Sequence, residues 1–361
     1  MAKQKPMSEA LFTSTFNAKP AMSAFAHGRA NLIGDHTDYN QGFVLPCLLT
    51  HRTHVSIAWT NDGMISGVSD DFGKASRPIE AHCDGTWLDF VTGAIALLKL
   101  HGLKANGINL AVSSTVPPGA GVSSSAALEI ALLRAMVQST GINTIDPTNM
   151  AFIAQKIEHD FIGTKCGIMD QMVVSVADQG QAMLLDCMSH EIELVNFFTS
   201  GVFLVIHSGS GRKLSEGLYN TRLQECQNAS ISLQRESLRQ ASLDDLPKIA
   251  DPIELKRARH VISENQRVLD AAAALKADAP EEFGLLMNQS HASLAEDYDV
   301  SSPELDKLVD VCQNNQALGA RLTGAGFGGC VVVLTRPEHQ TQILSAVKDQ
   351  CPQAYLVDCI Q

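Results

Sequence analysis

The chain has 361 residues, which is more than one compact core usually holds, so two domains are expected. Hydrophobic residues make up 45% of the chain and charged residues 18%, which is typical of a globular protein and excludes a largely disordered one. The formal net charge of −12 argues against nucleic acid or an anionic membrane as the main partner, because both attract basic surfaces.

The nine cysteines are odd in number and scattered, and no CxxC pair occurs, which argues against a disulfide framework and a zinc site. Residues 1–19 lack the long apolar core of a signal peptide. The most apolar helical stretch, 91–100, is too short to span a bilayer and contains Lys99. We therefore expect a reduced, cytoplasmic protein.

Hydrophobic periodicity predicts both strands and helices in each half of the chain. The first half is expected to contain strands at 44–49, 54–59, 107–112, 183–187 and 191–197, and helices at 87–101, 123–138 and 148–161. The second half is expected to contain strands at 202–206, 329–334 and 354–357, and helices at 217–239, 253–275, 281–296, 302–314 and 337–349. A break near residue 200 predicts two α/β domains, 1–200 and 201–361, with a ligand site in the cleft between them.

A glycine- and serine-rich loop at 117–127 joins a predicted strand to a predicted helix. Its glycines allow a tight turn, and the helix start offers free N–H groups and serine hydroxyls, so the loop suits a phosphate group. It does not match GxxxxGK[ST], and the catalytic signatures of protein kinases do not occur. A glycine turn with a serine N-cap is the structural alternative. The candidate nucleotide-binding residues are Gly119, Ala120, Gly121, Val122, Ser123, Ser124, Ser125 and Ala126.

A second glycine run, 323–329, precedes a predicted strand. The dinucleotide-binding loop instead follows a strand and opens a helix, which disfavours an NAD-binding protein. The run can form a wall of a ligand site, but taken alone it is better explained as a tight turn.

A polar segment at 28–42 gathers many hydrogen-bonding side chains. The acceptors Asp35 and Asp38 stand beside the donors Arg29, Asn31 and His36. Such a mixture suits a polyhydroxylated ligand, because a wrong substrate would leave these groups unpaired. A solvated turn is the alternative.

Together, the three segments resemble the GHMP kinase superfamily, and galactokinases in particular. Residues 28–46 are similar to the galactokinase sugar-binding signature, 117–129 to the ATP-binding motif and 321–330 to the third motif. Linking stretches within 158–171, 219–222 and 290–305 are also galactokinase-like, and the matches follow the family order. The resemblance implies a two-domain fold with an N-terminal mixed sheet backed by helices and a C-terminal ferredoxin-like α/β sandwich.

The resemblance also implies ATP-dependent phosphorylation of the anomeric hydroxyl of galactose, with Mg2+. Asp170 would accept or orient the proton of that hydroxyl, and Arg29 would lie near the transferring phosphoryl group. Ser124 and Glu158 would hold Mg2+. Trp87 is a candidate wall of the adenine pocket, with a core aromatic as the alternative. The implied sugar-binding residues are Asp35, His36, Asp38, Gly167 and Tyr219.

Three features depart from the pattern: Asp35 stands where galactokinases usually have Glu, His27 stands where they commonly have Pro, and the segment 215–218 before Tyr219 is longer than usual. These changes concern the sugar and leave the reaction class intact. The alternatives are a related kinase for another hexose or N-acetylhexosamine and a non-catalytic galactose sensor, although sensors tend to have a damaged serine loop. Galactose and ATP are the expected partners of a monomer.

Overall fold

The computed structural model describes residues 7–142, 144–211 and 215–361. It comprises two compact units, and the chain passes between them several times. The first unit contains residues 1–28, 51–117 and 123–176, and the second contains 29–50, 118–122 and 177–361. The predicted boundary near residue 200 stays a prediction.

The first unit is built on a mixed sheet. Strand β6 is antiparallel to β3 and parallel to β4, which pairs with β5, while β1 pairs with the other edge of β3. The mixed N-terminal sheet predicted from the sequence is therefore confirmed. The strands are β1 (Met22–Asn31), β3 (Pro46–Trp59), β4 (Met64–Ser69), β5 (Gly73–Pro78) and β6 (Ile108–Ser114), and β1 and β3 continue into the second unit.

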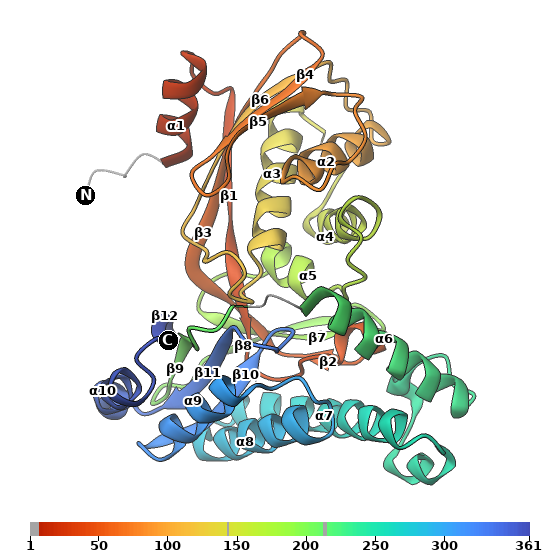
Figure 1. The fold of residues 1–361 in the computed structure, drawn as a ribbon, viewed down its shortest axis with the longest axis vertical. Coiled ribbons are helices and arrows are strands. Elements are labelled where there is room, and N and C mark those ends of the chain that lie inside the picture. Colours follow the sequence, from red (N-terminus) through yellow and green to blue (C-terminus); the bar gives the residue numbers. More distant parts are fainter. Residues whose placement is uncertain (1–6, 143, 212–214) are drawn as a thin grey trace. The chain divides into compact units, whose positions relative to one another are not determined.

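Helices cover this sheet, as Figure 1 shows. Helix α1 (Met7–Phe16) packs on β6, where Phe12 is fully buried against Val68 and Ala111. The other helices pack against one another, and α3 contributes an almost wholly buried Ala- and Leu-rich face. They are α2 (Leu88–Lys99), α3 (Ser124–Thr140), α4 (Pro147–Ile157) and α5 (Met169–Val176).

The second unit contains two groups of strands. Strand β7 (Gln181–Asp186) pairs with β8 (Ile192–Asn196), with β2 (Phe43–Val44) and with the first part of β3. A separate four-stranded sheet has the order β10–β11–β9–β12, with every neighbouring pair antiparallel. This order and the intervening helices give the ferredoxin-like arrangement. Its strands are β9 (Val202–His207), β10 (Ala317–Thr323), β11 (Cys330–Thr335) and β12 (Tyr355–Ile360).

A single hydrophobic cluster holds this second sheet to its helices. Strands β9 and β11 are buried along their whole length, which fits their near-continuous Val, Leu and Ile content. The helices are α6 (Ser215–Ser232), α7 (Pro252–Lys276), α8 (Pro280–Glu296), α9 (Pro303–Gln313) and α10 (Gln340–Gln350). Over the described residues, none of these or the other helices combines the length and apolar character needed to cross a bilayer.

Candidate active site

The serine loop begins helix α3 with a strained residue. Ser123 is its N-cap and has a φ of 57°, a left-handed conformation that is uncommon for a residue other than glycine. Its Oγ donates a hydrogen bond to Oδ2 of Asp170, in the first turn of α5. Because strained residues of this kind gather at functional sites, the Ser123–Asp170 pair is the first structural indication of one.

Two further carboxyl groups lie near this pair in the first unit. Glu158 begins a π-helical turn, Glu158–Ile162, directly after α4, and such turns are frequent at functional sites. Burial raises the pKa of Glu158 and the negative charge of Asp170 raises it further, whereas a hydrogen bond from Ser125 lowers it. The hydroxyl in contact with Glu158 is therefore that of Ser125; the role of Ser124 as a metal ligand stays a prediction.

The second carboxyl group, Glu129, was missed by the sequence analysis. It lies in α3, fully buried, and Nε2 of Gln171 donates to it at 3.4 Å. Burial raises its pKa well above the usual range, and the charges of Glu158 and Asp170 add to the rise. A lone carboxylate one helical turn after Ser125, within the apolar stretch 126–133 of the helix, is the signal that could have identified it.

Arg29 lies in the second unit and contacts the predicted phosphate-binding loop. It is buried, and its Nη1 donates to the carbonyl of Gly121 at 2.6 Å, while its backbone N–H donates to the carbonyl of Val122 at 3.1 Å. Gly119 and Gly121 both have positive φ. Residues of the predicted sugar-binding signature and of the predicted ATP loop therefore meet, although 90 positions or more separate them in sequence.

Asp35 is held by the third motif. Its Oδ2 pairs with Nη2 of Arg321 at 2.5 Å, and its Oδ1 accepts from the backbone N–H of Gly324 at 2.8 Å. Burial raises the pKa of Asp35, and the Arg321 guanidinium and the Gly324 N–H oppose that rise. Both oxygens are thus engaged by the protein, so a sugar hydroxyl at this carboxylate would have to share one of them.

Three other predicted sugar-binding residues also lie in the second unit. His36 is buried and has a φ of 66°, and its ring lies 5.8 Å from the ring of Tyr219 between centroids. Asp38 begins a short 3-10 turn and is half-buried. The buried Gly167 belongs to the first unit and precedes α5. Trp87 lies at the start of α2 and packs on Gly67, where a Cβ atom would lie only 2.5 Å from its ring.

His260 supports the polar segment from helix α7. Its Nε2 donates to the carbonyl of Asp35 at 3.2 Å, and its Nδ1 accepts from the hydroxyl of Ser293 at 2.9 Å, so the neutral ring is fully paired. Burial lowers its pKa to about 4, below its unfolded value near 6.5. Because the unfolded chain binds the proton first, this contribution to stability is present above pH 6.5 and is lost as the pH falls toward 4.

We therefore predict that the stability advantage of the wild type over His260→Gln shrinks by about 3 kcal/mol between pH 6.5 and pH 4. Urea unfolding at a series of pH values measures the change. The matched control is His101→Gln, because His101 is exposed. An unchanged difference between wild type and His260→Gln over this pH range would contradict the prediction.

Comparisons with known proteins agree with this arrangement. Residues 10–58 match the family model described as the galactokinase galactose-binding signature. Residues 89–177 match the GHMP kinases N terminal domain, and residues 271–353 match the GHMP kinases C terminal model. The fold and the three matched segments define a GHMP kinase.

Solved structures refine this class. The galactokinase of Lactococcus lactis, solved in complex with galactose, is 31% identical, with 96% of each chain covered and a TM-score of 0.90. The mevalonate kinase of Methanococcus jannaschii is 19% identical, with 94% of this chain and 98% of the other covered and a TM-score of 0.72. At this low identity, the similarity to the mevalonate kinase shows only that the two proteins share a fold. The chain belongs to the galactokinase family, and it is a sugar kinase that uses ATP.

Proposed function

We propose that this chain transfers the γ-phosphoryl group of ATP to the anomeric hydroxyl of galactose. The hydrogen bond from Ser123 to Asp170 is the observation that carries the catalytic assignment. It holds a half-buried carboxylate in a fixed orientation at the start of a helix, where the carboxylate can orient the sugar hydroxyl. Phosphoryl transfer asks little more of a protein than this kind of positioning and the stabilisation of charge.

The second part of the proposal assigns Arg29 to the transferring phosphoryl group and the loop 119–126 to the ATP phosphates. The contacts of Arg29 with Gly121 and Val122 support it, because they tie a guanidinium to the backbone of that loop. Trp87 borders the adenine in this proposal. The residues that bind the sugar hydroxyls are Asp35, His36, Asp38, Gly167 and Tyr219.

The residues present also fit a magnesium ion. Glu158 is a buried carboxylate whose pKa is raised by burial and by Asp170, so a nearby cation would stabilise its charged form. Mg2+ commonly takes one or two protein ligands and completes its shell with water and phosphate oxygens. The described residues contain no chelating group of three or more His, Cys, Asp or Glu side chains, and this site needs none. Glu158 with a hydroxyl of Ser124 or Ser125 would hold the ion, which would neutralise phosphate charge.

A coupled ADP assay with a panel of hexoses tests the proposal. We expect ADP release with galactose, at least tenfold lower kcat/KM with glucose and N-acetylgalactosamine, and loss of turnover when Mg2+ is removed by chelation. Turnover with another hexose alone would reassign the substrate. No turnover with any sugar would favour a sensor, and full activity after chelation would refute the magnesium site.

We also propose that the protein is a cytoplasmic monomer. The scattered, odd-numbered cysteines support the compartment. Light scattering after size-exclusion chromatography tests the oligomeric state.

A further inference from the structure

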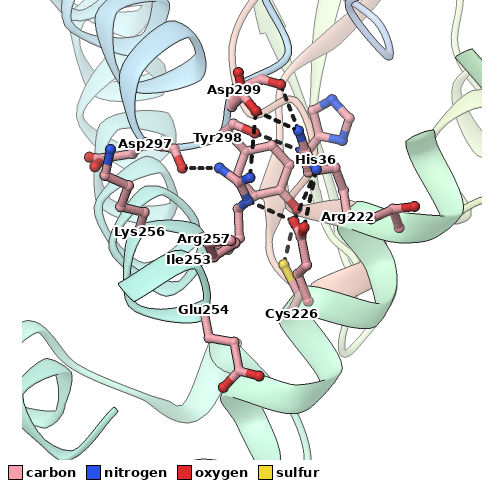
Figure 2. Close-up of polar contacts among 12 residues, drawn as sticks. His36, Arg222, Cys226, Ile253, Glu254, Lys256, Arg257, Asp297, Tyr298 and Asp299 are labelled. Carbon is pink, nitrogen blue, oxygen red and sulfur yellow. Dashed lines mark hydrogen bonds and ion pairs between the residues drawn. The ribbon is translucent and has the colours of Figure 1, made fainter. Parts of the chain in front are cut away.

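Four side chains of the second unit form a continuous chain of hydrogen bonds that ends at His36. The Nδ1 atom of His36 lies 2.7 Å from the hydroxyl of Tyr39, which lies 2.7 Å from the hydroxyl of Tyr298. The Tyr298 hydroxyl in turn lies 3.0 Å from Sγ of Cys226 in helix α6. We call Cys226, Tyr298 and Tyr39 the tyrosine relay; Figure 2 shows Cys226 and Tyr298 beside His36.

The relay keeps its protons at neutral pH. Burial raises the pKa values of Tyr39 and Tyr298 well above that of an exposed tyrosine, and it raises the pKa of Cys226 to about 11. Each oxygen and the sulfur therefore carries one hydrogen and can both donate and accept. Each group has a single hydrogen, so it can donate to only one of its two neighbours. The hydrogen bonds of such a chain therefore all run in the same direction.

Two arginines hold the backbone of Tyr298 in place. Arg222 donates to two consecutive carbonyls of the segment 297–299, at 2.8 and 2.9 Å, and Arg257 donates to a third at 2.7 Å. Glu225 forms ion pairs with both guanidinium groups. Figure 2 shows Arg222 and Arg257 beside Tyr298. The Tyr298 ring is fully buried and packs on His36 with centroids 4.8 Å apart. The phenol therefore has little freedom to move.

Asn40 contacts both ends of this chain of hydrogen bonds. Its Nδ2 donates to the carbonyl of His36 at 2.9 Å, and its side chain also bonds the thiol of Cys226. When the sulfur accepts from Asn40, its own hydrogen is available for Tyr298. In that arrangement the Tyr298 hydroxyl would donate to Tyr39, and the Tyr39 hydroxyl would donate to Nδ1 of His36; the two 2.7 Å distances fit this direction.

We propose that the tyrosine relay fixes His36 in the tautomer that carries its hydrogen on Nε2, and that Tyr298 and Cys226 are thereby positioning residues for sugar recognition. Because Nδ1 accepts from Tyr39, the ring presents a donor on its other nitrogen. A donor of this kind selects an oxygen of a sugar hydroxyl. The inference rests on the proposed binding of sugar by His36.

The first test is Tyr298→Phe, which removes one hydroxyl and keeps the ring. We expect the KM for galactose to rise about tenfold, with kcat and the KM for ATP within about twofold of the wild type. In a His36→Ala background the same substitution should raise the galactose KM no further. The proposal would be overturned if Tyr298→Phe raised the galactose KM equally in the wild type and in His36→Ala. It would also be overturned if the KM for ATP rose as much as the KM for galactose.

A pair of cysteine variants separates the relay from simple core packing. Cys226 and Cys312 are both fully buried in the same hydrophobic cluster, but only Cys226 bonds Tyr298. Cys226→Ala should raise the galactose KM several-fold, while Cys312→Ala should leave it unchanged at a similar cost in stability. Equal galactose KM values in the two variants would refute the relay.

A spectroscopic measurement tests the tautomer without turnover. In protein with 15N-labelled histidine, the His36 signals are assigned by their loss in His36→Ala. We expect Nδ1 without hydrogen in the wild type and a mixture of tautomers in Tyr298→Phe; identical spectra would contradict the proposal. An inactive wild type with the expected spectra would refute the proposed function alone.

Discussion

Asp170→Asn should lower kcat with galactose by a factor of at least about 1,000 while galactose still binds. The amide is almost the same size as the carboxylate, and its oxygen can still accept the hydrogen bond from Ser123. It can neither take a proton from the sugar hydroxyl nor supply the negative charge that orients it. ADP release measures turnover, and calorimetric titration with galactose measures binding.

Asp71→Asn is the matched control for this variant. Asp71 is exposed in the same unit, in the turn between β4 and β5, and the same chemical change there should leave kcat unaltered. If Asp170→Asn kept a tenth or more of wild-type turnover, Asp170 would not be the catalytic carboxylate.

Arg321→Ala should cause the largest loss of stability, on the order of 10 °C in Tm. Arg321 is fully buried, and its guanidinium donates to Asp35, to the hydroxyl of Ser290 and to the carbonyls of Asn31 and Leu32. The substitution would leave the Asp35 carboxylate and these acceptors without their donor in a dry site. Calorimetry or circular dichroism measures the shift.

Arg336→Ala provides the comparison for Arg321→Ala. Arg336 pairs with Glu281, whose side chain is 61% exposed, and donates to Ser200, so water can replace the lost partner and the expected loss in Tm is much smaller than for Arg321→Ala. Equal effects of the two arginine substitutions would mean that the buried pair with Asp35 contributes no more than a surface pair.

Local sequence patterns predicted most helices and strands of the fold. Helix α3 and strand β9 lie where apolar periodicity predicts them, because β9 is buried throughout and α3 buries most of its side chains between Ala126 and Met136. The helix predicted at 217–239 ends at Ser232, since the polar residues that follow form turns. Strands β4 and β5 were missed because their Gly, Ser and Lys residues interrupt the alternation of apolar and polar side chains that indicates a strand.

The candidate site was only partly accessible from the sequence. Glycine and serine motifs indicated the phosphate loop, and resemblance added Asp170 and Glu158. Tyr298 and Cys226 could not be found, because they lie in polar and helical stretches without a motif and gain meaning only through contacts with residues 36–40. Long-range hydrogen bonds of this kind leave no local pattern.

The contacts of the segment 29–50 have a consequence for synthesis on the ribosome. The backbone N–H of Gly34 donates to Glu264, and Asp35 pairs with Arg321, at separations of 230 and 286 residues. The chain loses conformational entropy when it closes loops of this length, and it does so before the long-range contacts can stabilise it. Folding is therefore slow. The unit that contains His36 therefore cannot close until nearly the whole chain has emerged, and the nascent protein should depend on chaperones during that delay.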